Sequence, residues 1–249
     1  MGKDKLKKWA EIRKFDHVIQ PVVEDVFEKD HLLKGKWAEK FFKNNYPIVL
    51  ELGCGKGEYT NNLAKKYNNK NFIGIDIKGA RIWKGAREIE EMGLKNVCFI
   101  RTRIELISSF FSKDEISGIW ITFPDPQSKR KREKKRLTNP WFLNLYKDFL
   151  ISEGIIHLKT DNFSLFEYTL DIVRQNNLEL LYSTNDLYND EVTDEDLYIK
   201  TYYEQQFIEE GKKINFLSFR LTNSEPIVTN QSAVHSPQSA KRIKIQTEN

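Results

Sequence analysis

The sequence predicts an α/β protein whose core is a doubly wound, mostly parallel sheet of seven strands with an antiparallel end. From about residue 47 onward, short apolar runs alternate with amphipathic stretches. Several of these runs are apolar on both faces, as in strands that are buried between two layers of helices. Only an acidic loop and a short helix separate the last two runs, which predicts an antiparallel pairing at the end of the sheet.

The expected strands are rich in Ile, Val, Phe and Leu, and the stretches between them predict helices and right-handed crossovers. In order, the expected strands are Ile48–Leu52, Phe72–Ile77, Val97–Thr102, Ile116–Phe123, Gly154–Thr160, Leu178–Ser183 and Ile214–Leu221. The expected helices span residues 57–67, 79–92, 139–151, 162–176 and 203–210.

Three parts are expected along the chain. Residues 1–46 form a basic arm that ends in a helix at Trp37–Asn44, and residues 47–222 form the α/β domain. Residues 223–249 are rich in Ser, Thr, Gln and Asn with few large apolar groups, so we expect a disordered tail.

The composition favours a cytoplasmic protein without a metal site. No apolar run approaches the roughly 18 residues of a membrane-spanning helix, and the N-terminus lacks the apolar stretch of a secretory signal. Cys54 and Cys98 lack metal-ligand spacing and are expected to be small buried residues. None of the four histidines forms a ligand pair, and His157, in mid-strand, is expected to be structural.

The positive charge is concentrated in one short segment. Residues 129–136 hold seven cations and one anion, whereas the whole chain carries a net charge of only +4. Such a run is usually a solvated face. Here it lies a few residues after Asp125, near the end of the fourth expected strand, where open α/β sheets bind ligands. It would therefore hold a polyanion where the chemistry occurs, which indicates a nucleic-acid substrate.

Polar groups follow five successive expected strands, at the edge where open α/β sheets bind ligands. The first strand leads into Gly53, Gly55 and Gly57, whose spacing differs from the dinucleotide G-x-G-x-x-G pattern. Glycines there let the backbone approach a ligand closely, and Asp76, about 20 residues later, is placed for a ribose hydroxyl pair. The alternative is an ordinary strand–helix turn with Asp76 as a helix cap.

A rigid acidic loop follows the fourth strand. Pro124 and Pro126 restrict the backbone on either side of Asp125 and remove two donors, which presents the carboxylate at a set angle. The alternative is a proline-rich turn in which Asp125 makes a local hydrogen bond.

Taken together, these segments resemble the tRNA (guanine-N7)-methyltransferase family of Rossmann-like, S-adenosylmethionine-dependent enzymes. The resemblance covers roughly residues 45–221 in order. The matching segments are Glu51–Gly57, Gly74-Ile75-Asp76, Phe123–Arg136, Lys159-Thr160-Asp161-Asn162 and Thr201-Tyr202-Tyr203-Glu204.

The resemblance implies a Rossmann-like class I methyltransferase domain that methylates N7 of a guanosine in tRNA, at position 46 of the variable loop. By matching position, the implied contacts to the methyl donor are Glu51, Gly53, Gly55, Gly57, Asp76, Thr102, Arg103 and Asp125. The implied contacts to the guanosine are Lys129, Asp161, Thr201, Tyr202, Tyr203 and Glu204. The cations expected to hold the RNA backbone are Arg130, Lys131, Arg132, Lys134, Lys135 and Arg136.

Two positions depart from the family's usual pattern. Gln127-Ser128 stand where the family has Trp-Pro, and Thr102 or Arg103 stands where it has an acidic residue after the third strand. Two other functions stay open: a methyltransferase acting on a protein or small molecule, and a non-catalytic RNA-binding protein. The need for a partner subunit also stays open.

The implied reaction needs alignment more than proton transfer, because guanine N7 carries an in-plane lone pair. Asp125 is the expected catalytic residue, orienting the guanine and stabilising the positive charge that develops on it, with Asp161 and Glu204 assisting.

Overall fold

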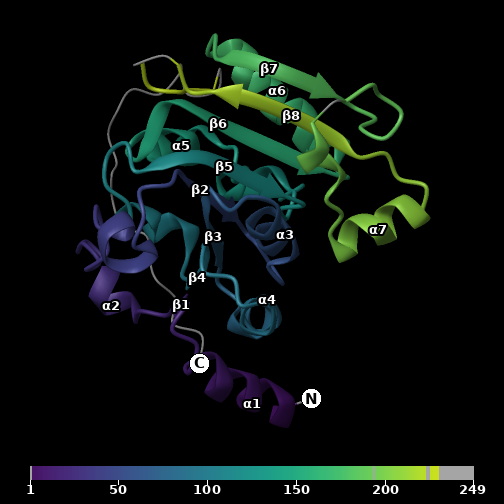
Figure 1. Ribbon diagram of the computed structural model, residues 1–249. Coiled ribbons are helices and arrows are strands. Elements are labelled where there is room, and N and C mark those ends of the chain that lie inside the picture. Colours follow the sequence, from purple (N-terminus) through teal and green to yellow (C-terminus); the bar gives the residue numbers. More distant parts are fainter. Residues whose placement is uncertain (1, 193, 223–224, 230–249) are drawn as a thin grey trace.

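The structure, a computed structural model, describes residues 2–192, 194–222 and 225–229 (Figure 1). One eight-stranded sheet runs through the molecule in the order β1-β4-β3-β2-β5-β6-β8-β7. The strands are β1 (Val18–Ile19), β2 (Ile48–Leu52), β3 (Asn71–Asp76), β4 (Val97–Arg101), β5 (Ile116–Thr122), β6 (Leu150–Thr160), β7 (Glu179–Thr184) and β8 (Asn215–Arg220).

The predicted α/β fold class and the antiparallel end of the sheet are confirmed. Strands β1 to β6 pair in parallel, and β8 lies antiparallel between β6 and β7. All seven predicted strands are present, with β6 beginning earlier than expected, at Leu150. The eighth strand, β1, was not predicted, because two residues are too few to show any periodicity.

The predicted helices are also present, with ends that differ by a few residues. The helices are α1 (Gly2–Ile12), α2 (Val23–Val26), α3 (Glu58–Lys66), α4 (Gly79–Met92), α5 (Pro140–Lys147), α6 (Phe163–Gln175) and α7 (Tyr202–Glu209). A π-helix spans Trp37–Phe42, and 3-10 helices span Ile104–Ser109, Arg130–Lys135 and Glu195–Tyr198.

Side-chain caps determine where three of these helices begin. Asn139 accepts a hydrogen bond from the Trp141 amide at α5, and Asn162 accepts one from the Leu165 amide at α6. Thr201 and Glu204 form a reciprocal capping box at α7. Such caps satisfy amides that would otherwise lack partners at helix starts, each contributing about 1 kcal/mol.

Helices cover both faces of the sheet, and each face has its own apolar core. On the front face in Figure 1, α3 and α4 pack on the sheet through side chains such as Tyr59 and Ile82, and α1 lies beside α4. On the opposite face, α5, α6 and the π-helix bury Leu143, Phe166 and Trp37. The central strands are therefore apolar on both sides, as their sequences predict.

The chain reverses its direction across the sheet between β2 and β5. From β2 the order continues through β3 and β4 to one edge, and from β5 it continues through β6 to the other. A crevice forms outside the carboxyl ends of such a strand pair, and ligands of open α/β sheets bind there. The segments that follow Leu52 and Thr122 therefore border the candidate site.

The described part of the C-terminal tail packs on the domain. Ile227 is buried, and its carbonyl accepts a hydrogen bond from Asn144 on α5 at 2.9 Å. The prediction of disorder for the rest of residues 223–249 lies outside the described residues. Within the described ranges, no helix is long and apolar enough to cross a membrane.

A close backbone approach holds α4 against the glycine loop. A methyl group on Gly85 would lie 2.5 Å from the carbonyl oxygen of Lys56 and 2.9 Å from Cζ of Phe99. Since a peptide oxygen cannot yield as a flexible side chain can, only glycine permits this contact.

We expect Gly85→Ala to destabilise the protein by about 1–3 kcal/mol, because overpacking outweighs the better helix propensity of alanine. Urea denaturation monitored by circular dichroism measures the change. Met92→Ala, at an exposed position of the same helix, is the control and should change stability by about 0.5 kcal/mol or less. A Gly85→Ala protein that is more stable than the parent would show that α4 does not approach the loop so closely.

Candidate active site

The glycine loop after β2 is held by the acidic residue that ends β3. Gly53, Gly55 and Gly57 all have positive φ angles, of 76°, 58° and 73°. The Gly55 amide donates to Oδ2 of Asp76 at 3.0 Å, and the Lys78 amide donates to Oδ1 at 2.7 Å. Because a carboxylate has about four acceptor positions, Asp76 keeps acceptor capacity for a ligand.

Glu51 lies buried near the carboxyl end of β2, between α3 and β5. Its Oε2 accepts hydrogen bonds from the amide and the hydroxyl of Thr60, and its Oε1 accepts one from the Thr122 hydroxyl at 2.5 Å. Burial raises the pKa of Glu51 from 4.5 to about 7, and the negative charge of Asp76 adds to the rise, whereas the three hydrogen bonds oppose it. A nearby positive charge would therefore favour the ionised form.

A pocket opens between these elements at the point where the sheet order reverses. Its floor comes from the carboxyl ends of β2 and β5, and its far wall comes from the start of α7. The lining residues are Glu51, Gly53, Cys54, Gly55, Lys56, Glu58, Arg81, Thr122, Phe123, Thr201 and Tyr203. The structure thus brings three of the expected donor contacts, Glu51, Gly53 and Gly55, together with two of the expected guanosine contacts, Thr201 and Tyr203.

The start of α7 is fastened to the glycine loop by polar and cation–π contacts. The Tyr202 amide donates to Oε2 of Glu58 at 2.9 Å. The Lys56 ammonium lies 4.1 Å from the centre of the Tyr202 ring and 5.6 Å from that of Tyr203. The outer parts of both tyrosine rings remain exposed, so they can meet a large substrate.

The acidic loop after β5 begins with a strained turn. The Phe123 amide donates to the Lys159 carbonyl on β6 at 2.8 Å, and both Phe123 and Gln127 have positive φ angles, of 46° and 47°. Asp125 is exposed, and its Oδ1 accepts from the Gln127 amide at 3.0 Å. The local turn hydrogen bond is therefore present, and it holds the carboxylate without burying it.

The remaining expected donor contacts, Thr102 and Arg103, follow β4 beside Asp76. Thr102 is buried, and Arg103 pairs with Glu105 at 3.2 Å. Asp161, an expected guanosine contact after β6, lies 3.5 Å from the ammonium of Lys212.

The basic segment 129–136 projects from the acidic loop, and its last residue differs from the others. Lys129 and the cations of the 3-10 helix Arg130–Lys135 are exposed, and no ion pair within the described ranges involves them. The Arg136 guanidinium instead lies 4.2 Å from the centre of the Tyr168 ring, and its Nε donates to the Pro126 carbonyl at 3.3 Å. Arg136 therefore fastens the segment to α6 and to the acidic loop.

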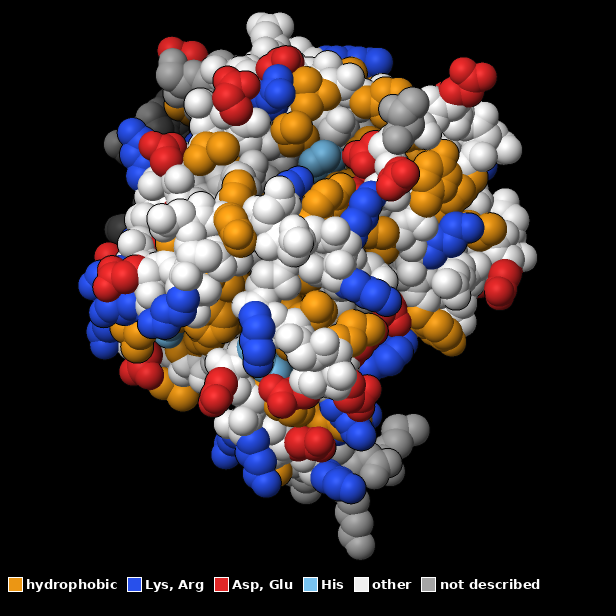
Figure 2. Space-filling view, viewed as in Figure 1, with side chains coloured by type: hydrophobic (Ala, Val, Ile, Leu, Met, Phe, Trp, Pro, Cys, Tyr) orange, Lys and Arg blue, Asp and Glu red, His pale blue; other side chains and the backbone are white. Residues whose placement is uncertain are grey.

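One face of the molecule carries charges of both signs. Figure 2 shows basic and acidic side chains interspersed over the face that α3 and α4 cover. This agrees with the small net charge of the chain and with a positive charge that is concentrated in a single segment.

Two groups of the site were not identified from the sequence, namely the hydroxyl donors to Glu51 and the lysine beneath α7. Thr60 and Thr122 have no pattern of their own, because they meet only through the packing of α3 on β2 and β5. Lys159 belongs to a segment that resembles the family, yet it had no assigned role. Its ammonium lies 2.7 Å from Oε1 of Glu204, and both side chains are fully buried.

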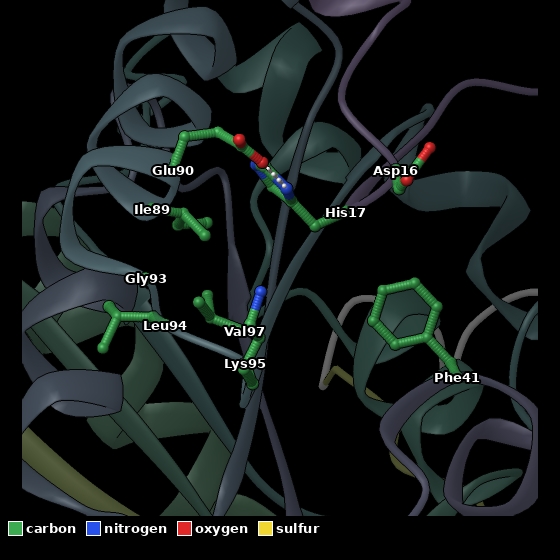
Figure 3. A pocket seen from close by; sticks show the side chains of 9 residues that line it. All are labelled: Asp16, His17, Phe41, Ile89, Glu90, Gly93, Leu94, Lys95 and Val97. Carbon is green, nitrogen blue, oxygen red and sulfur yellow. Dashed lines mark ion pairs between the residues drawn. The ribbon is translucent and has the colours of Figure 1, made fainter.

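A separate cavity of about 300 Å³ lies away from this site, at the amino end of β4 (Figure 3). His17 and Glu90 point toward one another there, with Nδ1 3.2 Å from Oε1, and Nε2 of His17 lies 3.0 Å from the Ala86 carbonyl. Burial lowers the pKa of His17. These contacts fasten the N-terminal arm to α4, which accounts for two of the polar side chains of the cavity, His17 and Glu90.

Comparison with known proteins agrees with the resemblance to a methyltransferase family. The family described as "Putative methyltransferase" matches residues 45–217. The chain is 53% identical over 221 residues to a tRNA (guanine-N(7)-)-methyltransferase of Christiangramia forsetii, covering 88% of this chain and 99% of that protein. It is 49% identical over 221 residues to the protein of that name from Bacteroides fragilis, covering 89% and 87%.

A solved structure shares the fold at much lower sequence identity. An antibiotic-related methyltransferase superposes with a TM-score of 0.54 at 18% identity, over 72% of this chain and 88% of that one. The arrangement of sheet and helices described above is therefore that of the Rossmann-like methyltransferases.

The raised pKa of Glu51 predicts a pH-dependent effect of Glu51→Gln on stability. The folded protein binds the Glu51 proton more tightly than the unfolded chain does, so the bound proton stabilises the folded state at low pH. This stabilisation is lost as the pH rises through 7. Glutamine is neutral throughout. The unfolding free energy of Glu51→Gln relative to the parent should therefore rise by roughly 2 kcal/mol between pH 5 and 8.

Urea denaturation at a series of pH values measures this difference. Glu167→Gln, at an exposed position on α6, is the control for the loss of a carboxylate as such. A pH-independent difference for Glu51→Gln would mean that the Glu51 carboxyl titrates alike in the folded and unfolded chains.

Proposed function

This chain belongs to the tRNA (guanine-N7)-methyltransferase family, and we propose that it transfers the methyl group of S-adenosylmethionine to N7 of guanosine 46 in the variable loop of tRNA. One observation carries the proposal: the exposed basic segment is fastened directly to the acidic loop beside the glycine-loop pocket. A polyanion bound by that segment would place a base at the pocket, whereas a small metabolite would not need so many cations.

The residues of the pocket fit the methyl donor. When bound, the donor supplies an electrophilic methyl group on a positively charged sulfur. The buried carboxylate of Glu51 would favour that charge, and the free acceptor positions of Asp76 would take the ribose hydroxyls. Gly53, Gly55 and Gly57 would admit the donor close to the backbone, and Thr102 and Arg103, beside Asp76, would lie toward its adenine.

The acceptor nitrogen needs no base, so the protein's contribution is alignment and charge stabilisation. Asp125 is held at a fixed angle by its turn and is exposed beside the pocket, where it would orient the guanine and stabilise its developing positive charge. Lys129, Asp161, Thr201, Tyr202 and Tyr203 would complete the guanosine contacts. The buried carboxylate of Glu204 would act indirectly, through the position of α7.

We further propose that the protein works in the cytoplasm with tRNA as its partner. The exposed cations of residues 129–135 would hold the RNA backbone, while Arg136 would keep that segment in place. Measuring the activity of the purified chain alone decides whether a second protein is required.

Transfer of label from radioactive S-adenosylmethionine to unmodified tRNA transcripts, followed by nucleoside analysis, tests the function. We expect labelled 7-methylguanosine, and no label in a transcript that carries adenosine at position 46. Donor binding without any label in RNA would refute tRNA as the substrate of the chain alone, and label in a protein extract would then favour a protein substrate.

Asp125→Asn should lower kcat about 100-fold while the affinity for the donor changes little, because the amide keeps the turn but loses the charge. Single-turnover methyl transfer and calorimetric donor binding measure the two quantities. Asp171→Asn, at an exposed position on α6, is the control and should retain full turnover. Full turnover of Asp125→Asn would remove Asp125 from the catalytic role.

Replacing Lys131, Lys134 and Lys135 with glutamine should flatten the salt dependence of tRNA binding. Each phosphate contact that is lost should reduce the log–log slope by about 0.7–0.9. The matched control replaces Lys36, Lys40 and Lys43, which are also exposed but lie in and beside the π-helix Trp37–Phe42, ahead of the amino end of β2. Equal slopes in the parent and in the first variant would place the RNA on another surface.

A further inference from the structure

Lys159 is buried beneath the candidate site, and its ammonium group is fully occupied. Among the residues that the structure describes, it is the only buried lysine or arginine. Its Nζ lies 2.7 Å from Oε1 of Glu204 and donates to the carbonyls of Leu197 at 2.6 Å and Ile199 at 3.2 Å. Three acceptors for three donors leave this ammonium nothing with which to contact a substrate.

The partners of Lys159 all lie in the segment that carries the start of α7 to the pocket. Leu197 and Ile199 precede Thr201, the first residue of that segment to line the pocket. Oε1 of Glu204 also accepts a hydrogen bond from the Tyr188 hydroxyl at 2.7 Å, and Oε2 accepts one from the Thr201 amide at 3.3 Å. One carboxylate therefore joins the lysine beneath the segment to the cap that begins α7.

The backbone of the same lysine joins the opposite wall of the site. The Phe123 amide, which begins the acidic loop, donates to the Lys159 carbonyl at 2.8 Å. Two residues further along the chain is Asp161. Lys159 thus connects, through its backbone and its side chain, the loop that presents Asp125 and the segment that presents Thr201 and Tyr203.

Asp196 makes a second attachment of the segment, nearer to α3. The hydroxyl of Tyr59 donates to its carbonyl at 2.7 Å, and Lys66 and Tyr67 contact its carboxylate at 2.8 Å and 2.9 Å. These bonds hold the middle of the segment, so the loss of Lys159 would free the part that borders the pocket without detaching the whole.

We propose that Lys159 and Glu204 form a buried ion pair whose role is to position the start of α7 against the glycine loop and the acidic loop, so that Lys159 is a positioning residue for methyl transfer. This inference rests on the proposed function and adds a residue that touches neither donor nor RNA. In this inference Glu204 affects activity by holding the start of α7 in position and does not contact the guanosine directly.

Two variants test the pair. Lys159→Met removes the ammonium and leaves the Glu204 carboxylate buried alone, which can impair folding. The double variant Lys159→Met/Glu204→Gln leaves no charge at the position of the buried pair and keeps the side-chain volumes similar, so it provides a folded test. The Leu197 and Ile199 carbonyls lose their donor in both variants, which frees the segment in each.

In the double variant we expect faster amide hydrogen exchange at residues 197–204 than in the parent, with exchange in the sheet unchanged. If the start of α7 is then in place in about a tenth of the molecules, donor affinity falls about tenfold. At subsaturating donor the rate of methyl transfer should fall by the same factor, and saturating donor should restore most of it, because the donor selects the molecules in which α7 is in place.

Trp37→Phe is the control for a loss of stability alone. Trp37 is fully buried at the opposite end of the sheet, and its Nε1 donates to the Phe110 carbonyl at 2.8 Å. This variant should melt at a lower temperature yet retain the parent's donor affinity and kcat below its melting range. A double variant that behaves like Trp37→Phe would overturn the positioning role.

Donor binding and hydrogen exchange are measured without RNA, so they separate this inference from the proposed function. Altered exchange and weakened donor binding would support the positioning role even if the parent did not methylate tRNA. Unchanged exchange and donor affinity in the double variant would refute it, whatever the substrate.

Discussion

The parallel pairing of β2 with β5 joins two halves of a sheet that continue in opposite directions, and the crevice at their carboxyl ends organises the rest of the molecule. The glycine loop leaves one strand of this pair and the acidic loop leaves the other. Glu51 on β2 and Thr122 on β5 meet across the pairing through a hydrogen bond of 2.5 Å. Any shift of one strand past the other would separate the pocket from the loop that presents Asp125.

Two buried ionisable groups near this crevice are stabilised in different ways. Glu51 has hydroxyl and amide donors, and none of the described residues in contact with it is a cation. Burial therefore raises its pKa to about 7. Lys159 has a carboxylate partner, which opposes the lowering of its pKa by burial. The first group is therefore suited to respond to a cationic ligand, whereas the second is already satisfied within the protein.

The wall formed by α7 illustrates how a segment near the end of the chain completes a site that begins near residue 50. Its capping box starts the helix, Glu58 on α3 accepts the Tyr202 amide, and Lys56 packs on both tyrosine rings. The backbone of the glycine loop also lies directly against Gly85 on α4, where a side chain would not fit. The pocket thus depends on α3 and α4, which follow the glycine loop closely in sequence, and on α7, which is distant from them in sequence.

The amino-acid sequence alone predicts the strands β2 to β8, the glycine loop and the proline-flanked Asp125, because burial on two faces requires apolar runs and sharp turns require glycine or proline. It did not reveal β1, since two residues carry no periodicity. Three pairings became visible in the folded chain: Glu204 is buried against Lys159, the Arg136 guanidinium lies over the Tyr168 ring, and Thr60 and Thr122 hold Glu51. Such pairings depend on which strands adjoin and how the helices pack on them, and no local pattern of residues encodes that arrangement.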